Sequence, residues 1–532
     1  MRGTTAVLLQ PGSTCWRTAP ASRALAILDT QDYFLAAKAA MRRARRSIHL
    51  LGWSFDPLTQ LTPDTEGGGP EDDRAGPFLR QLAQARPALD VRVLIWKSAL
   101  PVAASQHFFP HRARACFKHT PVHFRLDASV PFGACHHQKV LVIDDSLAFC
   151  GGGDISTDRW DSVRHLDGDR RRNMPTGGMH DPRHEVMLMV EGEAAAMLGD
   201  LFRRRWRRST GVTLPPAPSP TQATTQDLWP QGFTADFHDV QVGLARTEPA
   251  WRDQPEVCEN EALHLQAIKA ARRFIYMENQ YVASPAIGEA LAARLEQDDG
   301  PEVLIVSTEH SPSWFDRMTM DKTRSALIRR LQGADRHGRF HAYCPETQAG
   351  KTIIVHAKHT IIDDVMLRVG STNLNNRSTG FDTECDLAIE VGQGPEHAEA
   401  RAAIRRHRTR SLAHFLGVEP ATFEAAFART GGLAAAVEAL DTGSQRRLRK
   451  LGPVGIGPLA SVIATFHLGD PVTPSDSWRP WRRRQDVQDG LRRLAPELAD
   501  RPAWVDEPAR NGEPVRPEPA PSLQGEDFIP SD

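Results

Sequence analysis

The stretch HQKVLVIDDSLAFCGGGD at residues 137–154 has a counterpart in the same chain, HAKHTIIDDVMLRVGSTN at residues 356–373. A histidine, a lysine two positions later and an aspartate five positions after that recur at the same offsets, and a turn of small residues follows. One copy alone fits a polar strand end followed by a glycine turn equally well. Two matched copies are improbable by chance, so the chain is predicted to contain two related units.

Helical and strand-like patterns alternate around both copies, which is typical of an α/β fold. Helical spacing covers residues 24–47 and 197–208 in the first half, and 262–273 and 319–332 in the second. Apolar runs typical of strands cover residues 48–55, 91–96, 122–126, 140–143, 184–190, 274–282, 303–307, 340–344 and 386–391. The order of elements restarts after a Pro- and Thr-rich stretch, so the repeat is expected to be structural as well as chemical.

The chain has 532 residues, more than the roughly 250–300 at which single cores usually divide. Composition and pattern predict six parts. These are an irregular N-terminus (1–20), a first lobe (21–210), a linker (211–235), a second lobe (236–415), a small helical C-terminal cap (416–470) and a disordered tail (471–532).

Charge and cysteine content narrow the classes of function and location. The net charge is -1, whereas nucleic-acid binders usually carry a strong basic excess. The seven cysteines are scattered without a Cys-x-x-Cys pair, which favours reduced thiols over disulfides or a zinc site. The sequence predicts no signal peptide, and it contains no run of about 20 apolar residues. The expected location is cytoplasmic or peripheral to a membrane, with no nucleic-acid partner.

The repeated residues suit phosphoryl transfer. Residues i and i+2 of a strand point to the same face, so His137 and Lys139 should project together, as should His356 and Lys358. A neutral imidazole can attack phosphorus and a protonated one can protonate a leaving oxygen. Lysines can hold the phosphate oxygens as charge builds up, so neither a metal nor another cofactor is required.

The turns after each copy are expected to bind the substrate phosphate. Glycines at Gly151 and Gly152 allow the backbone to approach a phosphate closely, and Ser371 and Asn373 occupy the corresponding turn of the second copy. The Asn373 amide can donate a hydrogen bond, whereas an ionised Asp154 at the equivalent place cannot. The two halves are therefore not chemically identical.

Carboxylates near the motifs have two possible roles. Glu185 and Glu384 precede apolar strands after the two motifs, and either could fix the ring orientation of a histidine through Nδ1 or be a solvated strand end. Asp144 and Asp363 could act in catalysis or could be turn residues that end a strand. Glu185, Glu384, Asp144 and Asp363 are all kept as candidate catalytic residues.

The two His-x-Lys-x4-Asp motifs, followed by GGGD and GSTN, resemble the double signature of the phospholipase D superfamily. The segments GGGDISTDRWD (151–161), HEVMLMVEG (184–192), IYMENQYV (275–282) and NNRSTGFDTECD (375–386) resemble its phospholipase branch, of bacterial type. The resemblance runs from about residue 16 to about residue 415. It implies two similar α/β lobes, each a mixed sheet flanked by helices, related by a pseudo-twofold axis and sharing one active site.

The resemblance implies a phospholipase D that cleaves phospholipid to phosphatidate and a head-group alcohol, with water or another alcohol as acceptor. His137 would be the nucleophile of a phosphohistidine intermediate and His356 the general acid and then base. No cofactor is implied, and two motifs in one chain are compatible with an active monomer that meets phospholipid at the membrane surface. The alternatives are a cardiolipin synthase-like phosphatidyltransferase, a metal-independent nuclease of the superfamily, and a non-catalytic membrane-binding protein.

Overall fold

A computed structural model describes residues 7–63, 73–98, 109–217, 227–311, 314–443, 445–453, 469–474 and 483–498. The strands of the first lobe are β1 (Arg17–Leu28), β2 (Ser47–Gly52), β3 (Asp90–Trp96), β4 (His123–Asp127), β5 (Val140–Ile143), β6 (Leu147–Gly151), β7 (Arg183–His184) and β8 (Val186–Glu191). Its helices are α1 (Thr30–Arg43), α2 (Ala75–Ala85), α4 (Phe109–Cys116) and α5 (Glu193–Thr210).

The second lobe repeats this order. Its strands are β9 (Phe237–Glu248), β10 (Val257–Cys258), β11 (Phe274–Asn279), β12 (Glu302–Val306), β13 (Phe340–Glu346), β14 (Ile354–Val355), β15 (Lys358–Ile362), β16 (Met366–Gly370) and β17 (Glu384–Glu390). Its helices are α6 (Glu259–Ala270), α7 (Pro285–Leu295), α8 (Trp314–Ala334) and α9 (Ala398–Leu416). The elements that follow are α10 (Pro420–Thr430), α11 (Leu433–Leu440), β18 (Arg447–Lys450) and α13 (Arg483–Leu494).

One continuous mixed sheet joins the lobes. Its order is β18-β13-β12-β11-β15-β16-β17-β9-β1-β8-β6-β5-β2-β3-β4. Read outward from the centre, β1-β8-β6-β5-β2-β3-β4 matches β9-β17-β16-β15-β11-β12-β13, so equivalent strands occupy equivalent places. The central strands β1 and β9 pair antiparallel, with Ala21 opposite Val240. The predicted fold of two similar α/β lobes is confirmed, and the two sheets meet along this pair.

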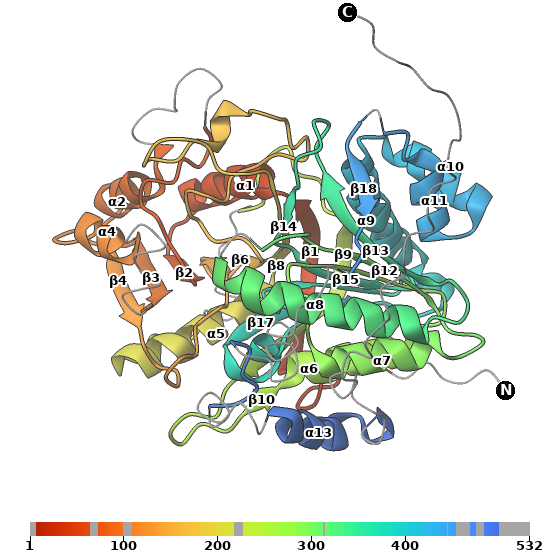
Figure 1. Ribbon diagram of the computed structural model, residues 1–532. Coiled ribbons are helices and arrows are strands. Elements are labelled where there is room, and N and C mark those ends of the chain that lie inside the picture. The colour runs from red at the N-terminus through yellow and green to blue at the C-terminus, as the bar shows by residue number, and fades with distance from the viewer. Residues whose placement is uncertain are drawn as a thin grey trace, which may run out of the picture.

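Helices cover each half of the sheet. Helices α1 and α2 pack on one face of the first half, and α6, α7 and α8 pack on the second half, where α7 and α8 lie side by side (Figure 1). Helices α5 and α9 contribute to a single core that contains strand residues from both lobes. The lobes approach closely there, and Cys150 Sγ of β6 lies 3.7 Å from Cys385 Sγ of β17. This shared core fixes the position of one motif relative to the other.

The motif hairpins show why the repeated sequence folds as it does. The residues of β5 and β15 are buried throughout, as expected for a central strand covered on both faces. Asp144 and Asp145 start the turn after β5 with φ of 53° and 52°, and Asp363 and Asp364 start the turn after β15 with φ of 53° and 57°. Aspartate is among the few residues that tolerate this left-handed region, so the Asp-Asp pair ends each strand.

The N-terminal region differs from the prediction. Residues 17–28 form the strand β1, and the helix expected over residues 24–47 covers only Thr30–Arg43. The alanines that favour a helix in isolation are buried between β8 and β9, where small side chains fit. Helix propensity is a weak prior, and tertiary packing overrides it here.

The region after residue 416 also differs. The predicted helical cap contains the helices α10 and α11. It also contains a strand, Arg447–Lys450, which pairs with β13 of the second lobe. Residues 483–494 form α13 rather than a disordered tail, and Leu494, Ala495 and Leu498 pack into the core of the second lobe. These few apolar residues lie in a highly charged stretch, so the sequence pattern did not predict that they pack into a core. Residues 499–532, the rest of the expected tail, lie outside the described residues.

The structure also bears on the expected linker and on the expectation of no membrane-spanning segment. The described residues 211–217 and 227–235 of the expected linker contain neither helix nor strand. Among the described helices, none is both long enough and apolar enough to cross a membrane.

Candidate active site

The ring of His137 is held by the second lobe. Its Nδ1 lies 3.0 Å from both carboxylate oxygens of Glu384, the first residue of β17, and 3.1 Å from the carbonyl oxygen of Ser371. A carbonyl oxygen can only accept a hydrogen bond, so these partners assign the hydrogen to Nδ1. In the neutral ring, Nε2 then keeps a free lone pair.

The ring of His356 is held by the first lobe. The short strands β7 and β14 pair in parallel, and the backbone N–H of His356 donates to the carbonyl oxygen of His184 at 2.8 Å. This brings His356 Nδ1 to within 2.7 Å of Glu185 Oε1, although the contact is not an aligned hydrogen bond. Each motif histidine therefore faces a glutamate of the other lobe, a crossing that the sequence did not reveal.

The two motif lysines are buried beside the histidines. Lys139 Nζ donates to the carbonyl oxygen of His137 at 2.8 Å, and Lys358 Nζ donates to that of His356 at 2.6 Å. Lys139 Nζ also lies 3.5 Å from Asp154 Oδ2. The structure thus brings the histidine and lysine of both motifs together with both glutamates.

The glycines of the first motif let neighbouring groups approach the backbone closely, and at Gly152 one of these groups belongs to the other lobe. A Cβ atom at Gly152 would lie 2.5 Å from Glu185 Oε2 and 2.8 Å from the His356 carbonyl oxygen, and one at Gly151 would lie 2.4 Å from the Val186 carbonyl oxygen. The equivalent of Gly152 in the second motif is Ser371, whose hydroxyl donates to Glu384 Oε2 at 2.5 Å. The turns therefore shape the His–Glu contacts, and phosphate binding by these residues stays a prediction.

Asp154 and Asn373 differ in their surroundings. Asp154 Oδ1 accepts hydrogen bonds from the backbone N–H groups of Trp53 at 3.0 Å and Ser54 at 3.3 Å. Asn373 is buried, and its Oδ1 makes no hydrogen bond within the described residues. Asp154 thus supports the backbone after β2, whereas Asn373 keeps an acceptor unused. Substrate binding by either residue remains a prediction.

The motif aspartates lie away from the motif histidines. The Asp144 carboxylate accepts from the backbone N–H groups of residues 45, 46 and 47 at 2.8–2.9 Å. The Asp363 carboxylate accepts from those of residues 272, 273 and 274 at 2.7–2.8 Å. Both lie at the far ends of β5 and β15 from the histidines, and they tie the motif hairpin to the start of a neighbouring strand. These contacts give Asp144 and Asp363 a structural role and do not support a catalytic one, which stays a prediction.

Burial controls the charge states in the site. It lowers the pKa of His137 and of His356 well below the usual value, and the nearby lysines act in the same direction. Burial also lowers the pKa of Lys358 to about 7. It raises the pKa of Glu384 to about 8 despite the opposing charge of Lys139. Such shifted groups, converging on one place, are typical of a catalytic centre.

Sequence reasoning missed three neighbours of the site. Trp53 stacks on Trp96 with ring centroids 5.9 Å apart and presents an edge to His137 at 6.4 Å. Arg159 and Arg183 are buried, and their charges add to the lowering of the His356 pKa. The sequence could have indicated Trp53, because it is an aromatic residue directly after a buried strand. The arginines lie in the insertion between the first motif and Glu185, where no spacing pattern marks them.

Two family models match the chain. The model described as "Phospholipase D" matches residues 40–290, and the one described as "Cardiolipin synthase, PLD-like domain" matches residues 264–406. Together they cover both motifs. The chain belongs to the phospholipase D superfamily. The predicted membership is therefore confirmed.

Individual relatives in the phospholipase D superfamily are distant. "Phospholipase D alpha 1" of Cynara cardunculus is 24% identical, with 69% of this chain and 61% of that protein covered. "Phospholipase D A" of Dictyostelium discoideum is 25% identical, with 68% and 32% covered. The chain thus spans less than two thirds of the length of these relatives. The crystal structure of a phosphatidylserine synthase of Haemophilus influenzae Rd KW20 matches with a TM-score of 0.51 at 14% identity over 79% of this chain and 97% of that one. That likeness concerns the fold alone.

Proposed function

We propose that this phospholipase D superfamily member is a phosphodiester hydrolase and transphosphatidylase that converts phospholipid to phosphatidate and a head-group alcohol. The observation that carries the proposal is the pair of crossed contacts, His137 with Glu384 at 3.0 Å and His356 with Glu185 at 2.7 Å. Two imidazoles, each beside a carboxylate and a lysine, suit a two-step transfer at phosphorus.

His137 is the proposed nucleophile. In the first step its Nε2 attacks phosphorus, a P–N bond forms, and the bond from phosphorus to the head-group oxygen breaks as His356 donates a proton to that oxygen. In the second step His356 takes a proton from water or an alcohol, whose oxygen attacks phosphorus and breaks the P–N bond. The Nδ1 contacts of His137 with Glu384 and Ser371 support this order, because they leave Nε2 unprotonated in the neutral ring.

The charged neighbours are given the supporting roles. Lys139 and Lys358 would neutralise the phosphoryl oxygens as charge develops, and the negative substrate in turn favours protonation of an imidazole. Glu384 and Glu185 would orient the rings, as a carboxylate does in other histidine-based sites. The substrate-facing contacts are assigned to Gly151, Gly152, Asp154, Ser371 and Asn373.

The proposed partner is phospholipid at a membrane surface, met by a peripheral, cytoplasmic or membrane-associated monomer. No nucleic-acid substrate is proposed, since the net charge is -1 and phosphate-backbone binding depends on cationic excess. The names of the curated relatives support phospholipid as the substrate class.

A phosphatidyltransferase that joins two glycerolipids is the second candidate. It rests on the match of residues 264–406 to the model described as "Cardiolipin synthase, PLD-like domain". The same covalent intermediate would serve both reactions, and only the acceptor would differ. Phosphatidylglycerol vesicles supplied as both donor and acceptor distinguish them, because cardiolipin with free glycerol would favour this candidate.

The decisive assay uses vesicles of phosphatidylcholine, phosphatidylethanolamine or phosphatidylglycerol, with EDTA present and with or without ethanol. We expect metal-independent release of head group, and phosphatidylethanol when ethanol is added. His137→Ala and His356→Ala should lose both products. The control, His397→Ala, changes a half-exposed histidine at the N-terminus of α9 and should retain them. No product from any of the three lipids would refute the proposal.

A further inference from the structure

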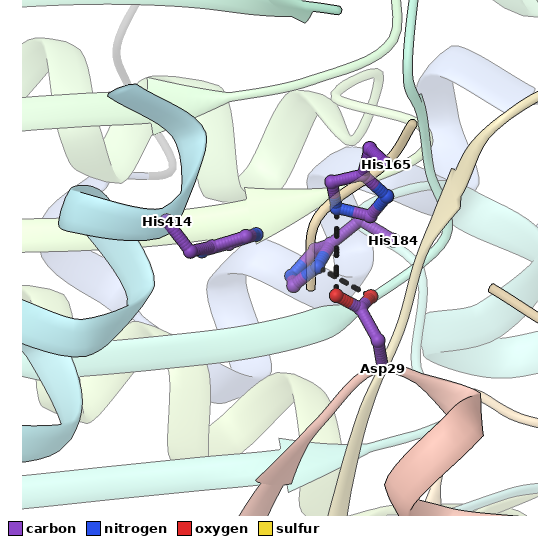
Figure 2. A group of neighbouring side chains, drawn as sticks. All are labelled: Asp29, His165, His184 and His414. Carbon is purple, nitrogen blue, oxygen red and sulfur yellow. Dashed lines mark hydrogen bonds and ion pairs between the residues drawn. The ribbon is translucent and has the colours of Figure 1, made fainter. Parts of the chain in front are cut away.

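A second cluster of histidines lies behind the candidate active site. Asp29, His165, His184 and His414 are all buried, and one donor atom of each lies within 4.8 Å of the others. Figure 2 shows the three rings converging on the carboxylate of Asp29 from separate segments. Asp29 joins β1 to α1, His165 lies in the insertion, His184 ends β7, and His414 is near the end of α9 in the second lobe.

The donor atoms that face the centre of this cluster have few hydrogen-bond partners. Within the described residues, no hydrogen bond reaches Asp29 Oδ2, His165 Nε2 or His414 Nε2. Asp29 Oδ2 and His165 Nε2 lie 3.4 Å apart, and His184 Nδ1 lies 2.9 Å from Asp29 Oδ1. Buried polar atoms without partners are rare and call for an explanation such as an ion.

The opposite nitrogen of each ring is held in place. His165 Nδ1 lies 3.0 Å from Asp161 Oδ2, His184 Nε2 lies 2.7 Å from Glu278 Oε2, and His414 Nδ1 donates to the carbonyl oxygen of Ser411 at 2.5 Å. Metal-binding histidines almost always make such a second contact with a carboxylate or carbonyl, which fixes the tautomer and leaves the other nitrogen for the metal. His165 and His414 show this arrangement, whereas the remaining nitrogen of His184, Nδ1, contacts Oδ1 of Asp29, the carboxylate that would share the metal.

The buried charges and the donor types of the cluster are compatible with a bound cation. The carboxylates of Asp29, Asp161 and Glu278 are all buried at the cluster, so a dication would offset part of their negative charge. His165 also lines a cavity of about 650 Å³, although its side chain is fully buried. Three imidazoles and one carboxylate form the kind of four-ligand set that zinc binds in tetrahedral geometry.

We propose that Asp29, His165, His184 and His414 form a structural zinc-type metal site that fastens the two lobes behind the active site. Three ligands belong to the first lobe and His414 belongs to the second. The site would not bind substrate, because its ligands are enclosed. This proposal does not depend on the proposed phospholipase activity.

The site would act on the catalytic residues through the backbone. Asp29 brackets Glu185 on both sides, since its N–H donates to the Glu185 carbonyl oxygen at 2.8 Å and its Oδ1 accepts from the Glu185 N–H at 3.0 Å. The carbonyl oxygen of His184 accepts from the N–H groups of His356 and Ala357 at 2.8 Å and 3.1 Å. A metal on Asp29 and His184 would therefore hold the backbone on both sides of Glu185 and next to His356.

The test uses the full chain, stripped of metal by a chelator, exchanged into chelator-free buffer and then titrated with Zn²⁺ or with Co²⁺. We expect about one ion per chain by elemental analysis, the visible absorption of tetrahedral Co²⁺, and a higher melting temperature with Zn²⁺. His165→Ala and His414→Ala should each weaken binding by at least about 100-fold, in line with the sensitivity of metal sites to their ligands and supporting groups.

Two matched variants define the controls. His397→Ala, at the other end of α9, and His137→Ala, in the candidate active site, should bind metal like the wild-type chain. If a ligand variant does not fold, the Co²⁺ absorption and stoichiometry of the wild-type chain still decide the matter. Substoichiometric metal with no rise in melting temperature would mean a hydrogen-bonded, protonated histidine cluster only, and would overturn the proposal. Equal metal binding by His165→Ala and His414→Ala would overturn it too.

Discussion

The two halves of the candidate active site have the same design but different hydrogen bonding. On one side, Glu384 is contacted by both His137 and the hydroxyl of Ser371. On the other, Glu185 faces His356 and Gly152, and neither of its oxygens makes an aligned hydrogen bond within the described part of the chain. A duplicated motif has thus become one firmly oriented histidine and one less restrained histidine, which suits a nucleophile and a proton carrier.

Removing the histidines should break the apparent symmetry most strongly. We expect His137→Ala to lower kcat by about 10⁶-fold, as loss of a nucleophile does elsewhere, and His356→Ala by about 10²–10⁴-fold, the usual worth of a general acid or base. A phosphatidyl ester with a nitrophenol leaving group needs no proton, so a burst of nitrophenol should return in His356→Ala and stay absent in His137→Ala. Equal recovery in both variants would contradict the assigned roles.

The kcat values of the two glutamate variants should differ from each other by a smaller factor than those of the two histidine variants. In Glu384→Gln an amide can donate to His137 Nδ1 and stabilise the wrong tautomer, so above pH 8, where Glu384 is ionised, we expect a loss of about 10³–10⁴-fold in kcat, comparable to the analogous change in a catalytic triad. Glu185→Gln should cost less, because its contact is less well aligned. Steady-state kinetics on one phospholipid compare the two variants. A larger loss in Glu185→Gln would reverse the comparison.

The residue that distinguishes the two halves can be changed directly. Ser371→Gly makes the second motif like the first, and removal of the hydrogen bond to Glu384 should lower kcat by about 10-fold. The reciprocal change, Gly152→Ser, places a Cβ only 2.5 Å from Glu185 Oε2 and should be more damaging. Kinetics together with circular dichroism distinguish loss of activity from loss of fold. Full activity of Gly152→Ser would contradict the close approach of Glu185 and of the His356 backbone to Gly152.

The motif aspartates should affect stability more than activity. Asp144→Ala and Asp363→Ala each leave three backbone N–H groups without their acceptor, so we expect a loss of about 2–3 kcal/mol in the free energy of unfolding. Activity of the folded fraction should stay within about 2-fold of wild type, since neither carboxylate reaches the site. Denaturant titration and assays below the unfolding transition test this. A catalytic loss as large as that of His356→Ala would support the catalytic assignment.

The smallest expected effect is on the pH dependence of stability. Burial raises the pKa of Glu384 from 4.5 to about 8, so between these values the folded chain binds more protons there than the unfolded chain. Its contribution to stability is therefore full below pH 4.5 and is lost as pH rises toward 8. Glu384→Gln should flatten this decline, as measured by melting temperature across the window. An unchanged slope would mean that Glu384 does not titrate as inferred.

Local pattern was sufficient for the parts of the chain that repeat. The apolar runs of β5 and β15 and the paired aspartates that end them identify the motif hairpins, because both periodicity and turn chemistry are local properties. The central strands were harder. Alanines in β1 gave a helical pattern, and β9 was not predicted although Val240, Val242 and Leu244 alternate. Their pairing with each other depends on partners far away in the chain.

Residue types at short, repeated spacing were enough to identify the family, the two α/β lobes and the residues His137, Lys139, His356 and Lys358. Folding then pairs Glu384 with His137 and Glu185 with His356, and no local pattern predicts these contacts because they cross between lobes joined by β1 and β9. It also places Asp144 and Asp363 away from the motif histidines and gathers Asp29, His165, His184 and His414. Donors so far apart in sequence have no spacing to read, and the folded core alone brings them together.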